Sequence, residues 1–191
     1  MDEIVTVAAR FKPAATSGVE SVRPYGSGNI NDTYLVCVGG REPNRFILQR
    51  INQNVFPYPE LIMANLRAVT EHVAAREMPD PSRRWELPTI VVTAEGEDYL
   101  VDAQGEFWRA LSFIEGARTY PKVNSPQHAG EAGYALGRFQ RSISDLDIRK
   151  LHDTLPGFHI MPHYLRLYDR ALEMGPRASS DRSGPHAAEV R

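Results

Sequence analysis

The chain contains near its start the stretch Tyr25-Gly26-Ser27-Gly28-Asn29-Ile30-Asn31-Asp32-Thr33-Tyr34-Leu35-Val36. An extended run, residues 20–25, enters this stretch, and a β-rich run, residues 33–38, leaves it. The glycines and asparagines between the two runs tolerate positive φ, and backbone N–H groups in such a concave turn can bind a phosphate. The stretch has two interpretations, a phosphate-binding loop and a β-hairpin turn that needs glycine. By itself it favours the hairpin.

The composition is that of an ordinary globular protein. The chain has 191 residues, which is long enough for one domain or two small lobes. Of these residues, 42% are hydrophobic and 24% are charged. The formal net charge of -2 and the lack of a long apolar run argue against nucleic-acid and membrane partners. A single cysteine, Cys37, excludes an internal disulfide, so we expect a cytoplasmic protein.

The first half of the chain is expected to be α+β. A short helix within residues 1–12 ends before Pro13, and a connector of small residues follows at 14–19. Turn residues separate the β-rich runs, which predicts two antiparallel meanders and a sheet of five or six strands. The strands are expected at residues 20–25, 33–38, 45–51, 87–93, 99–103 and 107–114.

One long helix is expected to pack on this sheet, from Pro59 to Arg76. Its apolar stripe recurs at helical spacing. The stripe consists of Ile62, Leu66, Val69 and Val73. The third strand, residues 45–51, carries Gln49 and Arg50 near its end, and these alternate faces. An arginine there either reaches a phosphate held by the glycine loop or is simply solvated.

The second half is expected to be helical. Ser125 and Pro126 form an N-cap and N1 pair, and an apolar stripe follows from Ala129 to Ile143. Another helix is expected at residues 162–173. We therefore divide the chain into a sheet-containing lobe (1–117), the beginning of a helical lobe (118–174) and a disordered or truncated tail (175–191).

The glycine loop matches neither of two common nucleotide motifs. No Gly-Lys-Ser/Thr follows it, which excludes a P-loop, and it leads into a strand rather than a helix, which excludes a Rossmann fingerprint. The order of strand, glycine loop, strand, strand with a polar end, helix and further strands is that of the small lobe of a protein-kinase-like fold.

The glycine loop and the strands that follow it carry a specific family resemblance. The loop stretch together with Phe46-Ile-Leu-Gln-Arg-Ile-Asn52 resembles the aminoglycoside phosphotransferase/choline-kinase-like superfamily. Within it the chain is most similar to the bacterial N-acetylhexosamine 1-kinase group, through the strings at 108–120, 137–140 and 155–159. The resemblance covers residues 25–172 and implies a kinase-like sheet lobe followed by the start of a helical lobe.

The resemblance implies a nucleotide site. The loop residues would lie over the ATP phosphates, and either Gln49 or Arg50 would replace the phosphate-binding lysine, with charge favouring Arg50. Asn65 would stand where kinases place the glutamate that pairs with that lysine. The hinge, residues 113–116, would present backbone groups to adenine. The implied cofactor-binding residues are Gly26, Ser27, Gly28, Asn29, Asn31, Gln49, Arg50, Asn65, Phe113, Ile114 and Glu115.

The catalytic part of the family pattern is missing. The sequence contains no His-Gly-Asp or similar loop, and Asp145-Leu146-Asp147 is interpreted as a helix-end loop. We therefore assign no catalytic residue and no metal ligand, and expect an inactive fragment of a kinase that uses ATP, Mg²⁺ and a small hydroxyl-bearing substrate such as an amino sugar. The alternative is a non-catalytic nucleotide-binding or interaction module of kinase-like fold.

Overall fold

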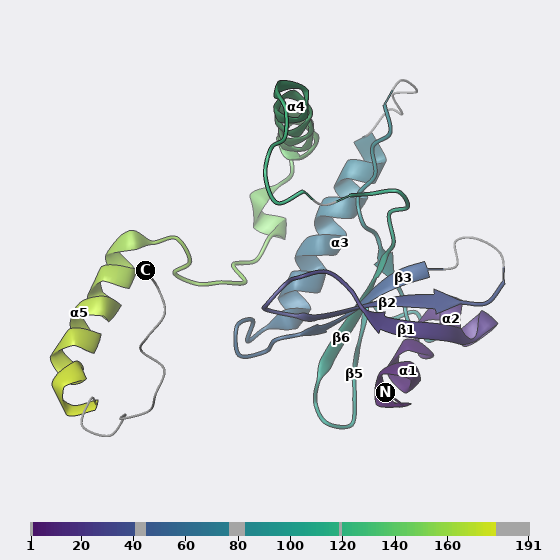
Figure 1. Cartoon of the computed structure of the whole chain (residues 1–191), viewed down its shortest axis with the longest axis horizontal. Coiled ribbons are helices and arrows are strands. Elements are labelled where there is room, and N and C mark those ends of the chain that lie inside the picture. The colour runs from purple at the N-terminus through teal and green to yellow at the C-terminus, as the bar shows by residue number, and fades with distance from the viewer. Residues whose placement is uncertain (1, 41–44, 77–82, 119, 179–191) are drawn as a thin grey trace. The chain divides into compact units, whose positions relative to one another are not determined.

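An antiparallel sheet of six strands organises the first part of the chain (Figure 1). The computed structural model describes residues 2–40, 45–76, 83–118 and 120–178. The chain divides into two compact units, residues 1–154 and 155–191. The strands lie in the first unit and are β1 (Val19–Pro24), β2 (Asp32–Val38), β3 (Arg45–Ile51), β4 (Ile90–Val91), β5 (Tyr99–Val101) and β6 (Phe107–Ser112). The predicted α+β class and the antiparallel sheet are confirmed.

The strand order is β1-β2-β3-β6-β4, and β5 also pairs with β6. The predicted first meander, β1 to β3, is therefore correct. The predicted second meander is correct in its hairpin of β5 and β6 and wrong for β4, which pairs with the same edge of β6 instead of with β5. β5 pairs with residues 107–109 and β4 with residues 110–111, while β3 occupies the opposite edge. β4 is also shorter than the predicted strand at 87–93.

Two short helices cover one face of the sheet, α1 (Asp2–Ala8) and α2 (Lys12–Ser17). They bury the main apolar cluster, in which Phe11 is 0% exposed and its ring lies 6.2 Å from that of Phe46. A short helix that ends before Pro13 was predicted and is present as α1, but the predicted connector at 14–19 is wrong, because most of it belongs to α2. Pro13 lies in the first turn of α2, where a missing N–H leaves no intrahelical hydrogen bond unmade.

The helix α3 (Pro59–Arg76) packs on the other face, and its bounds agree with the prediction. It buries a second apolar cluster with Ile51 and Phe107. The residue of α3 that contributes most is Met63, which is 2% exposed and was not part of the predicted stripe. Because the helix crosses only one end of the sheet, the rest of that face carries other side chains.

The helix α4 (Pro126–Ile143) begins as predicted, since the Ser125 hydroxyl accepts a hydrogen bond from the His128 N–H at 3.1 Å. Its predicted apolar stripe is not buried: no residue of α4 is, and Leu136 is 59% exposed. The helix contacts α3, and Asp145 just beyond it forms an ion pair with Arg76 and a hydrogen bond of 3.0 Å with His72 Nε2, both on α3. A 3₁₀ turn, Ile148–Lys150, follows.

The second unit contains α5 (Met161–Ala178). This helix extends past Gly175, where the sequence predicts a tail without structure, and the remainder of that tail, residues 179–191, lies outside the described residues. No helix among the described residues has both the length and the apolar character needed to cross a membrane.

Replacing Phe11 by Ala should destabilise the fold by about 3–5 kcal/mol, because it removes a ring that is fully enclosed between α1, α2 and the sheet. Val101→Ala on β5 is the control, since Val101 is 51% exposed and its truncation should cost about 0.5 kcal/mol or less. Urea unfolding followed by tryptophan fluorescence measures both. Equal midpoints for the two variants would contradict the placement of Phe11.

Candidate functional site

The loop between β1 and β2, residues 25–31, is open on its outer side. Gly26 has φ +82°, a conformation that favours glycine, and a Cβ built on Gly26 or Gly28 would meet nothing within 4 Å. A hollow of about 270 Å³ follows the loop. It is lined by Pro24, Tyr25, Gly26, Gly28, Asn31, Asp32, Thr33 and Tyr34. The predicted phosphate-binding loop thus has space for a ligand over its backbone.

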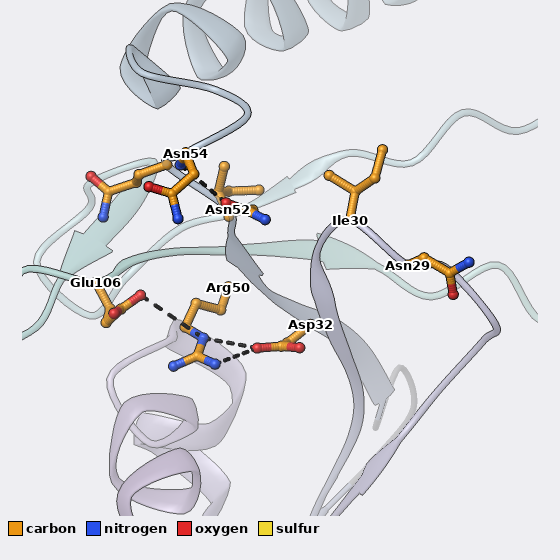
Figure 2. A pocket seen from close by; sticks show the side chains of 9 residues that line it. Asn29, Ile30, Asp32, Arg50, Asn52, Asn54 and Glu106 are labelled. Atoms are coloured by element: carbon orange, nitrogen blue, oxygen red, sulfur yellow. Dashed lines mark hydrogen bonds and ion pairs between the residues drawn. The ribbon is translucent and has the colours of Figure 1, made fainter. Parts of the chain in front are cut away.

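Asn31 ties the loop to the end of β3. Its side-chain Oδ1 accepts a hydrogen bond from the backbone N–H of Asn52 at 3.0 Å. Beside this contact lies a second, larger pocket of about 530 Å³ (Figure 2). It is lined by Asn29, Ile30, Asp32, Arg50, Ile51, Asn52, Gln53, Asn54 and Glu106. The loop and the segment after β3 therefore line one pocket, and most of its lining side chains are polar.

Arg50 lies in this larger pocket and is already paired. Its Nε donates to Asp32 Oδ2 at 2.9 Å, its Nη2 also contacts that carboxylate, and Glu106 lies 3.9 Å away (Figure 2). The hydrogen bond with Asp32 raises the pKa of Arg50. Its guanidinium also lies over the Trp108 ring, on the sheet face that α1 and α2 cover.

Gln49 faces the opposite side of the sheet, the side on which α3 packs. There it lies between Thr33 of β2 and Arg109 of β6, which are its direct cross-strand neighbours. Gln49 Nε2 donates to the Thr33 hydroxyl at 3.0 Å, and Gln49 Oε1 accepts from Arg109 Nε at 3.0 Å and Nη2 at 2.9 Å. We call Thr33, Gln49 and Arg109 the polar row.

Arg109 is a candidate that sequence reasoning missed. Its neighbours on β6 are Phe107, Trp108 and Ala110, all of them buried. Burial lowers the pKa of Arg109 from its ordinary value, since desolvation disfavours the charged form. A single arginine within an otherwise apolar strand was the available signal, but the strand register needed to place it beside Gln49 is not readable from one strand alone.

Asn65, the predicted counterpart of the kinase glutamate, contacts neither Gln49 nor Arg50 among the hydrogen bonds of the described residues. Its carboxamide instead binds the backbone of His152 in both directions, donating to the carbonyl at 2.8 Å and accepting from the N–H at 2.8 Å. Asn65 thereby fixes the segment after the 3₁₀ turn to α3. Its predicted role toward a nucleotide stays a prediction.

The predicted hinge meets the predicted loop. The ring of Phe113 lies edge-on to that of Tyr25, with centroids 5.7 Å apart. Arg45 covers the Phe113 ring and pairs with the Glu115 carboxylate at 3.1 Å. The Glu115 carbonyl accepts a hydrogen bond from Arg84 Nη1 at 2.6 Å. Two arginines therefore hold the hinge next to the start of the loop: Arg45 from β3, and Arg84 from the segment before β4.

The described residues contain no group of three or more His, Cys, Asp and Glu side chains placed to hold a metal ion. The Asp-x-Asp pair after α4 is used structurally: Asp145 pairs with α3, and Asp147 caps the 3₁₀ turn by accepting from the Arg149 N–H at 3.0 Å. This agrees with its interpretation as a helix-end loop.

The chain matches a known protein family. A family model described as the phosphotransferase enzyme family matches residues 21–187, which is most of the chain. The match includes the glycine loop, the polar row and the hinge.

Replacing Asn31 by Ala should free the loop, because the Asn52 N–H loses its acceptor. One hydrogen bond of about 1 kcal/mol corresponds to a rise of about fivefold in the exchange rate of that amide, measured by NMR. Asn31→Asp keeps an oxygen acceptor and should keep the amide protected. The Gln104 amide, which binds Asp102 Oδ1 at 3.0 Å elsewhere, is the internal reference. Unchanged exchange at Asn52 in Asn31→Ala would show that this contact does not hold the loop.

Proposed function

The chain belongs to the phosphotransferase enzyme family, and from that premise we propose that it forms the nucleotide-binding part of an ATP-dependent small-molecule kinase. The observation that carries the proposal is that three features far apart in the sequence come together on one sheet. The glycine loop, the polar row and the hinge, residues 25–31, 33/49/109 and 113–116, lie on or beside the same three strands.

The triphosphate is proposed to lie under the glycine loop. Gly26 and Gly28 leave the backbone open, so a phosphate can approach N–H groups that a larger side chain would cover. Asn31 holds the loop in one position through Asn52, which lowers the entropy that binding must remove. Ser27 and Asn29 line the same loop and would supply polar side chains to the phosphates.

The adenine ring is proposed to lie between the polar row and the hinge. Leu35, Ile47 and Leu111 are direct cross-strand neighbours on three successive strands, on the same face as Gln49. Ile47 and Leu111 are half-buried and leave apolar surface for a flat ring. Because Arg84 already occupies the Glu115 carbonyl, we assign the adenine contacts to the backbone of Phe113 and Ile114.

Phosphoryl transfer needs groups that the described residues do not bring together. Its rate depends on a base that orients the acceptor hydroxyl and on carboxylates that hold Mg²⁺. The sequence has no His-Gly-Asp loop, and the described residues hold no metal-binding cluster, so the residues described here do not fit a Mg²⁺ site of their own. We therefore propose that this chain binds ATP without transferring phosphate, which is the behaviour of a non-catalytic module.

For the complete reaction we propose a hydroxyl-bearing amino sugar of the N-acetylhexosamine class as acceptor. The support is the similarity of the strings at 108–120, 137–140 and 155–159 to that group of kinases. A cytoplasmic location is proposed as well. It is supported by the availability of ATP there and by the single, unpaired Cys37.

ATP should stabilise the chain, by about 2.7 kcal/mol at a concentration a hundredfold above its Kd, as measured by thermal unfolding. Gly26→Ala should weaken ATP binding about fivefold or more, because alanine is strained at φ +82° and the loop must move. Gly96→Ala is the matched control, since Gly96 has φ +92° and equally open surroundings in the turn between β4 and β5. A stabilisation by ATP that Gly26→Ala leaves intact would argue against this loop as the site.

Incubation of the chain with labelled ATP, Mg²⁺ and N-acetylhexosamines should yield no sugar phosphate above the background without protein. The reason is the missing base and metal ligands. Mass spectrometry of the sugars detects the product. Formation of sugar phosphate at a rate proportional to protein concentration would overturn the proposed lack of transfer while leaving nucleotide binding in place.

A further inference from the structure

We propose that Arg109 is the cation that binds the nucleotide's phosphates, and that Gln49 is the positioning residue that aims it. This proposal rests on the proposed function and deepens it, because it names the charged group of a site for which sequence reasoning favoured Arg50. It depends on the placement of the two arginines relative to the sheet and on what each of them already binds.

The two arginines lie on opposite faces of the sheet. Arg50 faces the side covered by α1 and α2, where its positive charge is balanced by Asp32 and Glu106. Arg109 faces the side of Gln49 and Thr33. The negative charges of two neighbouring carboxylates offset the attraction of an arginine for a phosphate.

Arg109 has fewer charged partners than Arg50 among the described residues. Among the described residues, its guanidinium is bound by the neutral Gln49 carbonyl and forms no ion pair with a carboxylate. Of the five N–H donors in a guanidinium, two bind Gln49, which leaves three for a ligand. A largely buried cation without a counter-charge is costly, and a bound anion would remove that cost.

The polar row leads from Arg109 to the loop. Gln49 holds the guanidinium toward β3, and its amide group binds Thr33, whose hydroxyl lies 3.5 Å from the Asn31 carbonyl of the loop. Thr33 also lines the hollow that follows Gly26 and Gly28. Adjacent strands lie about 4.8 Å apart, so a guanidinium held under β3 is within reach of a phosphate placed beneath β2 and the loop.

A glutamine at position 49 can orient the Arg109 guanidinium without repelling or neutralising it, which a lysine or a glutamate there could not do. A lysine would repel Arg109, and a glutamate would neutralise it and remove the free charge. A glutamine orients the guanidinium with one oxygen and leaves its charge available. The absence of a lysine from the strand Arg45–Ile51 is thus explained if the cation comes from the neighbouring strand instead.

The test is isothermal titration of the 191-residue chain and its variants with ATP and, separately, with adenosine. Arg109→Met should weaken ATP binding about 10- to 100-fold, the worth of charge-assisted hydrogen bonds, and leave adenosine binding near that of wild type. Arg109→Lys keeps the charge but loses the paired donors, so its affinity for ATP should lie between those of wild type and Arg109→Met. Gln49→Glu should also weaken ATP more than adenosine, because it neutralises Arg109.

Arg10→Met is the control, since Arg10 pairs with the exposed Glu95 outside the polar row and should bind ATP as wild type does. Arg50→Met separates the two arginines and should affect ATP less than Arg109→Met. Equal losses for ATP and adenosine in Arg109→Met would indicate a structural role and overturn the proposal. So would unchanged ATP binding, or a larger ATP-specific loss in Arg50→Met. If Arg109→Met fails to unfold cooperatively, Arg109→Lys and Gln49→Glu carry the same comparison.

The failure of this proposal and the failure of the proposed function are distinguishable. A wild-type chain that binds neither ATP nor adenosine overturns both. A wild-type chain that binds ATP while Arg109→Met binds it equally well overturns only the assignment of Arg109.

Discussion

The pairing register between β3 and β6 is the constraint on which the rest of the site depends. It sets Gln49 opposite Arg109 and Arg50 opposite Trp108, and therefore decides which polar group shares a face with which. Because side chains alternate along a strand, a slip of one residue would exchange the two faces. The apolar neighbours oppose such a slip, since Phe46, Leu48 and Ala110 fill the cluster under α1 and α2.

The two faces of the sheet carry different kinds of groups for this reason. On one face the apolar cluster is complete, and the charge of Arg50 is balanced at its margin by Asp32. On the other face α3 covers only the end that holds Ile51 and Phe107. The rest of that face holds the polar row and the half-buried Ile47 and Leu111. A stable fold does not need a half-buried arginine there, and the ligand proposed above accounts for its presence.

The helix α4 beyond the hinge adds few buried contacts to this arrangement. α4 contacts α3 and has no buried residue, and the links beside it are polar: Asp145 with His72, and Asn65 with the backbone of His152. The face proposed to bind the nucleotide is consequently built from the sheet, the loop and α3. The chemistry of transfer would need groups that neither the sequence motifs nor the described residues contain.

Local sequence patterns correctly predict the class of the fold, the first three strands, the bounds of α3 and the start of α4. These depend on local signals: alternation, turn glycines, a proline at N1 and a serine N-cap. It also indicated the glycine loop and the hinge as parts of one site, and the family match agrees with the kinase-like class. The helix α2 was missed because a proline in the sequence is equally compatible with the end of one helix and with the first turn of the next.

Three features could not be predicted from local patterns: β4 and β5 share an edge of β6, Met63 fills the second cluster, and Gln49 meets Arg109. Each of these depends on which segments lie side by side, and the pairing of residues 60 positions apart leaves no mark in either strand alone. Charge alone therefore selected Arg50, the nearer arginine in the sequence. The physical reason is that burial and counter-charges, which set what an arginine can bind, exist only once the sheet has formed.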